Sequence, residues 1–175
     1  MTSIPAGTML NCGSGQRPFE QQHGWINLDI QERWNPDIIA DWNDLHMFAD
    51  DSMDIVVNHH GIEHVNCSEA DAFIRETYRI LKPGGSLLIF VPNLRTLAER
   101  WLNRQIDDYI YIVNLMGAFM GDSHDMHRWH YTPESLRDTL LKNGAWTKIV
   151  PFNWRNIPGA NLAKDFWIMA TEAVK

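Results

Sequence analysis

The 175-residue chain has little of what builds disulfide-rich, membrane-spanning or secreted proteins. Its two cysteines, Cys12 and Cys67, are too few for a disulfide framework and do not have the spacing of a metal motif. No apolar run reaches the length of a membrane span, and the N-terminus lacks the charged region and apolar run of a signal peptide. We therefore expect a cytoplasmic protein with no membrane partner.

Positive charge is also scarce. The chain has 15 Lys and Arg against 22 Asp and Glu, for a formal net charge of −7, and it has no basic stripe. Electrostatic capture of nucleic acid is therefore not expected. No internal repeat, low-complexity tract or Pro/Gly/Ser linker divides the sequence, so we predict a single domain over residues 1–175.

What the chain does have is an alternation of short apolar runs and longer helix-like segments. A helix is expected over Ser68–Leu81, with Ser68 as its N-cap, and another opens at Thr132–Pro133 and ends at Gly144. Strands separated by helices predict an α/β fold with a mostly parallel sheet, helices on both faces and an antiparallel final hairpin. The expected strands are Thr8–Leu10, Trp25–Asp29, Asp37–Asp41, Asp54–Asn58, Ser86–Val91, Lys148–Trp154 and Asp165–Ala170.

One long segment does not fit this alternation. Residues 94–131 follow the fifth expected strand, and the part from Leu94 to Met120 is helix-like and apolar. We interpret residues 94–131 as a helical cap, with its closing loop, inserted into the domain.

The first expected strand runs into a glycine-rich turn, Asn11-Cys12-Gly13-Ser14-Gly15. Glycines let the backbone approach a ligand closely, and a short helix expected over Gln16–Gln22 would present its N-terminus there. Asp29 ends the second expected strand, where a carboxylate can accept both hydroxyls of a ribose. Taken alone, these features are equally compatible with a structural turn and a solvated strand-end carboxylate.

Four segments contain motif-like residue patterns, and they follow one another along the chain: Met9–Gly15, Gly24–Asp29, Phe48–Val65 and Glu76–Asn93. The third contains Phe48-Ala-Asp-Asp-Ser-Met-Asp54 and Glu63-His64, and the fourth contains Leu81-Lys-Pro-Gly-Gly85. Together they resemble the class I S-adenosylmethionine (SAM)-dependent methyltransferases, in the group with the pattern "PF-x-D-x-S-x-D … LEH … LKPGG". The likeness runs from about Thr8 to Val174. It implies a Rossmann-like seven-stranded fold, SAM as cofactor and methyl transfer as the activity.

The resemblance also implies roles for particular residues. The turn would lie under the methionine part of SAM, Asp29 would bind the ribose, and Asp41 would bind the adenine amino group beside the Trp42 backbone. Asn58 and His59 would border the sulfonium, and the Glu63-His64 pair would mainly support its loop. The family usually has an acid at the position of Asn11 and a further glycine near Arg17. The predicted cofactor-binding residues are Asn11, Cys12, Gly13, Gly15, Asp29, Asp41, Trp42, Asn58 and His59.

Catalysis of methyl transfer from a sulfonium depends mostly on aligning the acceptor with the methyl carbon. A general base is needed only if the acceptor must lose a proton; the candidates are the histidines His59, His60, His124, His127 and His130, of which we name His59, His127 and His130. Histidines that only make core or loop hydrogen bonds are the alternative. A second cluster, Asp122, His124, Asp125, His127 and His130, has ligand chemistry but no ordered metal motif, so no metal site is predicted.

We expect the methyl acceptor to be a small molecule. Two other readings stay open: a non-catalytic subunit with the SAM fold that activates a partner, and a nucleotide-binding oxidoreductase. Pro18 stands where the dinucleotide fingerprint needs its third glycine, which argues against the oxidoreductase. Binding measurements with SAM and NAD would separate the three.

Overall fold

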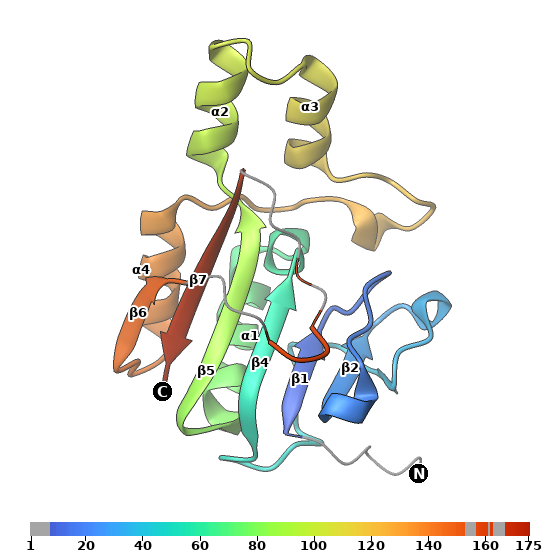
Figure 1. The fold of residues 1–175 in the computed structure, drawn as a ribbon, viewed down its shortest axis with the longest axis vertical. Helices are drawn as coiled ribbons and strands as arrows, with labels where there is room; N and C mark the ends of the chain where they lie inside the picture. Colours follow the sequence, from blue (N-terminus) through green and yellow to red (C-terminus); the bar gives the residue numbers. More distant parts are fainter. Residues whose placement is uncertain (1–7, 153–156, 161, 163–166) are drawn as a thin grey trace.

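The structure is a computed structural model that describes residues 8–152, 157–160, 162 and 167–175 (Figure 1). Its centre is a seven-stranded sheet in the order β3-β2-β1-β4-β5-β7-β6. Strands β1 to β5 pair in parallel, whereas β7 runs antiparallel to both β5 and β6. The predicted α/β, Rossmann-like fold with an antiparallel final hairpin is confirmed. The strands are β1 Met9–Cys12, β2 Trp25–Asp29, β3 Ile38–Ile39, β4 Met53–His59, β5 Leu81–Pro92, β6 Lys148–Pro151 and β7 Ile168–Val174.

The last two predicted strands are only partly placed. β6 stops at Pro151, and β7 starts at Ile168 and continues to Val174, beyond the predicted end at Ala170. Trp154 and Asp165, which bound the predicted segments, lie outside the described residues.

Two helices, α1 (Cys67–Ile80) and α4 (Pro133–Asn143), cover one face of the sheet. The N-cap of α1 is Asn66 rather than Ser68, because the Asn66 side chain accepts hydrogen bonds from the backbone N–H groups of Ser68 and Glu69. The prediction for α4 is confirmed, with Thr132 as N-cap and Pro133 in the first turn. Alternate residues of the strands bury themselves against these helices, which makes this face the larger part of the core.

The predicted short helix Gln16–Gln22 does not form. Within residues 13–24 only a 3-10 turn, η1 (Gln21–His23), is present. Pro18 has no backbone N–H and disfavours helical dihedrals at Arg17. The buried Asn27 side chain takes over instead, accepting from the Phe19 N–H (2.7 Å) and donating to the Phe19 carbonyl (3.0 Å). Phe19 then packs in the second, smaller core on the other face of the sheet.

The predicted insertion after β5 forms two helices, α2 (Leu94–Leu102) and α3 (Asp108–Met116), and a 3-10 turn, η4 (Ser123–Asp125). We call residues 94–131 the cap. Figure 1 shows α2 and α3 standing above the carboxyl ends of the parallel strands, with the rest of the cap returning across those ends. None of the described helices is both long and apolar enough to cross a membrane.

Candidate functional site

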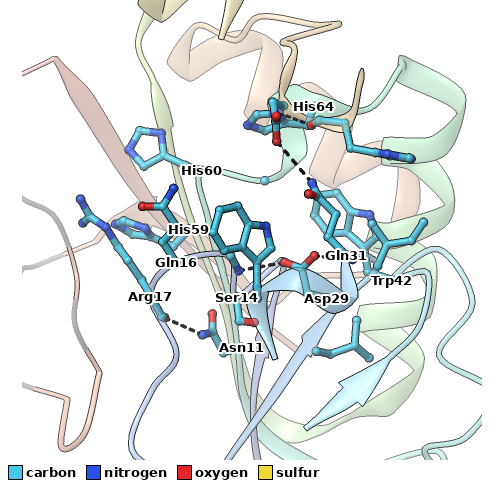
Figure 2. Close-up of a pocket in the computed structure, with 18 of the residues that line it drawn as sticks. Asn11, Ser14, Gln16, Arg17, Asp29, Gln31, Trp42, His59, His60 and His64 are labelled. Carbon is cyan, nitrogen blue, oxygen red and sulfur yellow. Dashed lines mark hydrogen bonds between the residues drawn. The ribbon is translucent and has the colours of Figure 1, made fainter. Parts of the chain in front are cut away.

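A cleft of about 460 Å³ lies at the carboxyl ends of β1, β2 and β4 (Figure 2). This is where open α/β sheets bind their ligands, and the volume is in the range of small-molecule sites. The lower part of the lining comes from the first two strands and their turns: Asn11, Gly13, Ser14, Gly15, Leu28, Asp29 and Gln31. The opposite wall and the roof include His59, His60, Gly61, His64, Ala118, Met120, His124, Asp125 and His127.

The glycine-rich turn wraps tightly over the end of β2. Gly13 and Gly15 have φ values of 72° and 47°, in the left-handed region that favours glycine. The backbone N–H groups of Gly13 and Ser14 donate to the Leu28 carbonyl at 2.8 and 3.1 Å. The turn therefore follows β2 closely and offers its outer side to the cleft.

The Asp29 carboxylate lies in the lower part of the lining, which we call the floor of the cleft, and is 7% exposed. One oxygen accepts from the Gly15 N–H and the other from the Gln31 N–H, both at 2.8 Å (Figure 2). A carboxylate offers about four lone-pair sites, so each oxygen can accept a further hydrogen bond from a ligand hydroxyl. Asp29 is thus held in one orientation by the backbone and still faces the cleft.

Two predicted cofactor residues lie behind the cleft rather than in it. Asn58 is 0% exposed; it donates to the Cys12 carbonyl (3.0 Å) and accepts from the Ile62 N–H (2.8 Å). Cys12 is buried, and its burial, followed by the charge of Asp29, raises the pKa of the thiol far above its usual value. The Asn58 side chain thus connects the turn after β1 to the segment after β4, and the Cys12 thiol packs in the core beneath the cleft.

The Asn11 side chain also has a supporting role. It lines the cleft, but its amide donates to the Arg17 carbonyl (3.2 Å) and to Asn27 Oδ1 (3.0 Å). An amide can make both contacts because it is a donor, whereas the acid usual in the family could not donate. The Asn11 amide therefore helps to hold the backbone of residues 17–19 in its non-helical conformation.

Of the two residues predicted at the adenine, Asp41 and Trp42, only Trp42 lines the cleft. The exposed Asp41 carboxylate accepts from the Asn43 N–H at 2.9 Å and is not among the described residues that line the cleft. Trp42 does line it and packs on Phe73 of α1, with 4.8 Å between ring centroids. A second tryptophan of the lining, Trp34, was not predicted; no motif marks it.

Of the three predicted bases, His59 and His127 line the cleft and His130 does not, among the described residues. The His59 ring packs near Phe90, 5.4 Å between centroids. Burial lowers the pKa of His127 to about 4, and burial also lowers the pKa of His130. A general base works best when its pKa is near the working pH, so His127 is poorly suited to that role at neutral pH.

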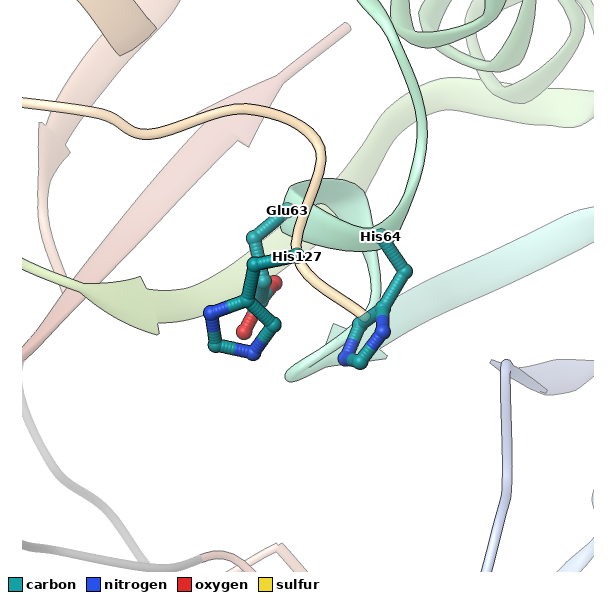
Figure 3. A group of neighbouring side chains, drawn as sticks. All are labelled: Glu63, His64 and His127. Carbon is teal, nitrogen blue, oxygen red and sulfur yellow. The ribbon is translucent and has the colours of Figure 1, made fainter. Parts of the chain in front are cut away.

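The cleft brings together a cluster that sequence reasoning missed: Glu63, His64 and His127 (Figure 3). Glu63 and His64 belong to the 3-10 turn η3 (Ile62–His64), and the sequence indicated only a supporting role for that pair. Burial acts to raise the pKa of Glu63, but the hydrogen bond from His60 and the charges of His60, His64 and His127 lower it overall to about 2. Because His127 is distant in the sequence, no local spacing could have revealed the cluster.

A buried carboxylate of the cap connects it to the segment that follows β2. Asp125 accepts from Arg33 at 2.5 Å and from the Met120 and Asp122 N–H groups at 2.8 and 3.1 Å. Burial acts to raise the Asp125 pKa, but these partners together lower it. This ionised group fixes the returning part of the cap over the cleft.

A family described as "Methyltransferase domain" matches residues 20–89. The chain has the fold of the SAM-dependent methyltransferases. A SAM-dependent methyltransferase from Archaeoglobus fulgidus superposes with a TM-score of 0.64 at 17% identity, covering 98% of this chain and 87% of that one. One from Methanosarcina mazei gives a TM-score of 0.61 at 17% identity, covering 98% and 93%.

Two relatives are similar in sequence, and both are named demethylmenaquinone methyltransferase. The protein of Streptomyces griseus is 28% identical over 178 residues, which cover 93% of this chain and 70% of the relative. The protein of Streptomyces avermitilis is 30% identical over 124 residues, which cover 66% of this chain and 50% of the relative.

Proposed function

We propose that the chain binds SAM in the cleft and transfers its methyl group to a small-molecule acceptor. The observation that carries the proposal is the buried Asp29 carboxylate, oriented by the Gly15 and Gln31 N–H groups at the end of β2 in a methyltransferase fold. The match of residues 20–89 to a methyltransferase domain supports the same assignment.

In this proposal the methionine part of SAM lies over Gly13–Gly15 and the ribose hydroxyls donate to Asp29. The adenine lies against Trp42, which lines the cleft; Asp41 is exposed and does not line the cleft among the described residues, so it is left out of this binding set. Asn11, at the edge of the cleft, and Cys12 and Asn58, behind it, hold the turn in place.

The chemistry requires little beyond this placement. An acceptor atom attacks the methyl carbon in line with the breaking C–S bond; the sulfonium becomes a neutral thioether, and the positive charge passes to the acceptor, which releases it as a proton to solvent. Holding the reacting atoms in line supplies most of the acceleration. In this proposal His59, at the carboxyl end of β4, borders the sulfonium, and a dry pocket does not oppose the loss of charge at sulfur.

In this proposal the cap lines the part of the cleft that SAM does not occupy, and the acceptor binds there. Ala118 and Met120 line that side, and the preceding helix α3 exposes Tyr109, Ile112 and Met116. An apolar acceptor fits such walls. Demethylmenaquinone, an apolar quinone and the substrate named for both relatives, is therefore the first acceptor to test.

The test uses SAM with a labelled methyl group, incubated with the protein and reduced demethylmenaquinone, and separately with a small-metabolite extract. We expect the label to enter an organic-soluble product while demethylated SAM accumulates in equal amount. Asp29→Ala should lose both signals. Tight SAM binding without transfer to any acceptor would instead favour the non-catalytic subunit.

A further inference from the structure

The rings of His64 and His127 are oriented by the same kind of hydrogen bond. His64 Nδ1 lies 2.8 Å from the His124 carbonyl oxygen, and His127 Nδ1 lies 2.9 Å from the Asn114 carbonyl oxygen. Because a carbonyl oxygen only accepts, both Nδ1 atoms must carry the proton, which leaves each Nε2 with its lone pair. Histidines that bind metals through Nε2 commonly donate their other N–H to a backbone carbonyl.

Glu63 supplies the third group. Its side chain is 1% exposed; Oε1 is paired with His60 Nδ1 at 3.0 Å, and Oε2 has no hydrogen-bond partner among the described residues. A buried carboxylate oxygen without a partner is costly. One ligand atom from each of Glu63, His64 and His127 lies within 4.8 Å of the others (Figure 3). A cation among them would complete the coordination of the buried carboxylate.

The backbone holds the two contributing segments together. The N–H groups of Arg128 and Trp129 donate to the Glu63 carbonyl at 2.7 and 3.1 Å, and the His127 N–H donates to the Met116 carbonyl at 3.0 Å. At Gly117 (φ 79°) a Cβ would stand 2.3 Å from the Asp125 carbonyl, so only glycine lets the end of α3 approach this closely. The arrangement of the three side chains is thus built into the fold.

We propose that Glu63, His64 and His127 form a site for one divalent first-row transition metal ion of the Zn²⁺ type. Two imidazole nitrogens and one carboxylate are a ligand set of catalytic zinc sites, which keep a further position open. Mg²⁺ and Ca²⁺ prefer oxygen ligands throughout and suit this set poorly. Zn–N bonds of about 2.0–2.1 Å would require the three ligand atoms, which lie within 4.8 Å of one another, to move closer together.

The place of the site indicates its use. His64 and His127 both line the cleft, so the open coordination position faces the ligand. A metal there would hold an oxygen atom of the acceptor and orient it toward the methyl group. This use rests on the proposed methyl transfer, whereas metal binding itself does not.

Equilibrium dialysis of chelator-treated protein against Zn²⁺ alone, without SAM, tests the site. We expect one tightly bound equivalent, and Co²⁺ in its place should give the visible absorption of a nitrogen- and oxygen-bound ion. Glu63→Gln and His127→Ala should each weaken Zn²⁺ binding at least about tenfold. His46→Ala is the matched control, because His46 is an exposed histidine beside Asp44, away from the cleft, and its loss should change nothing.

Circular dichroism checks that each variant is folded. His64→Ala serves as a second test because its side chain is only half-buried. Substoichiometric Zn²⁺ binding by the wild-type protein would overturn the proposal, as would stoichiometric binding that folded His64→Ala retains in full. Wild-type protein that binds SAM but no Zn²⁺ would reject the metal site alone and leave the proposed function standing.

Discussion

The floor of the cleft and helix α3 of the cap are built in opposite ways. The floor, comprising residues 11–15, 27–29 and 58–62, places buried polar side chains such as Asn27, Asp29 and Asn58 in contact with backbone groups. In the cap, α3 buries none of its residues and exposes Tyr109, Ile112 and Met116. Under the proposed function, we infer that the floor fixes one conformation for SAM, whereas α3 leaves apolar surface exposed for the acceptor.

Among substitutions in the floor, Asn58→Ala should cause the largest loss of stability. The substitution leaves the Cys12 carbonyl and the Ile62 N–H buried without partners. We expect the free energy of unfolding to fall by about 2–4 kcal/mol, measured by urea denaturation. Asn114→Ala in the cap is the control, because that amide makes one local bond to the Ile110 carbonyl and should cost much less. Equal losses would refute the contrast between the two regions.

Asp29→Ala tests the floor through its ligand. Removing the carboxylate deletes the hydrogen bonds proposed for the ribose, and it also releases the Gly15 and Gln31 N–H groups. We expect the SAM dissociation constant to rise roughly 10- to 100-fold, equivalent to about 1.4–2.7 kcal/mol. Calorimetric titration of a variant with native circular dichroism measures it. Unchanged affinity would mean that Asp29 does not contact SAM.

Low pH should weaken the contact between α1 and α4 behind the sheet. Asp71 of α1 accepts from Lys142 and, at 2.6 Å, from Asn143 of α4. Burial acts to raise the pKa of Asp71, but these hydrogen bonds and the charges of Lys142 and Arg75 lower it below 3.8. A lowered pKa in the folded state stabilises the protein above the unfolded-state pKa, and this contribution disappears as the pH falls through the folded-state value.

The melting temperature of wild-type protein should therefore drop between about pH 5 and pH 3 more steeply than that of Asp71→Asn. Scanning calorimetry over that range compares the two. Parallel curves would show that the contact between α1 and α4 does not depend on this carboxylate.

The smallest effect on stability is expected in the cap. Tyr109 and Ile112 are 76% and 55% exposed, so replacing both by serine should change the free energy of unfolding by no more than about 0.5 kcal/mol. SAM affinity should also stay the same. The KM for an apolar acceptor should rise several-fold in steady-state assays. A cap that only supports the domain would give the reverse pattern, with lower stability and unchanged KM.

Sequence reasoning predicted the sheet well because β-branched runs and the LKPGG segment are local signals. Trp25–Asp29 was predicted with its observed bounds, and the Thr132–Pro133 start of α4 was also right. The missing helix after β1 was not predicted, although Pro18 was noted. Its replacement depends on Asn27, whose amide reaches residues 17–19 only through tertiary contacts.

The site was predictable in part for the same reason. Asp29 and the glycines of the turn lie at the cleft because strand ends in a parallel sheet converge. No sequence pattern distinguishes a polar side chain facing the cleft from one behind it, so Asn58 and Asp41 were expected in contact with the cofactor. The Glu63, His64 and His127 cluster depends on the cap returning over η3, which no short-range pattern encodes.

Titration of the purified protein with SAM in a calorimeter tests the central claim most directly, with NAD as the matched negative ligand. The account predicts one SAM bound per chain with a dissociation constant in the micromolar range, about −8 kcal/mol, and no heat with NAD. The demethylated product should bind in the same range, because the floor contacts the parts that SAM and this product share. Absence of SAM binding at millimolar concentration, or tighter binding of NAD, would contradict the assignment of the cleft.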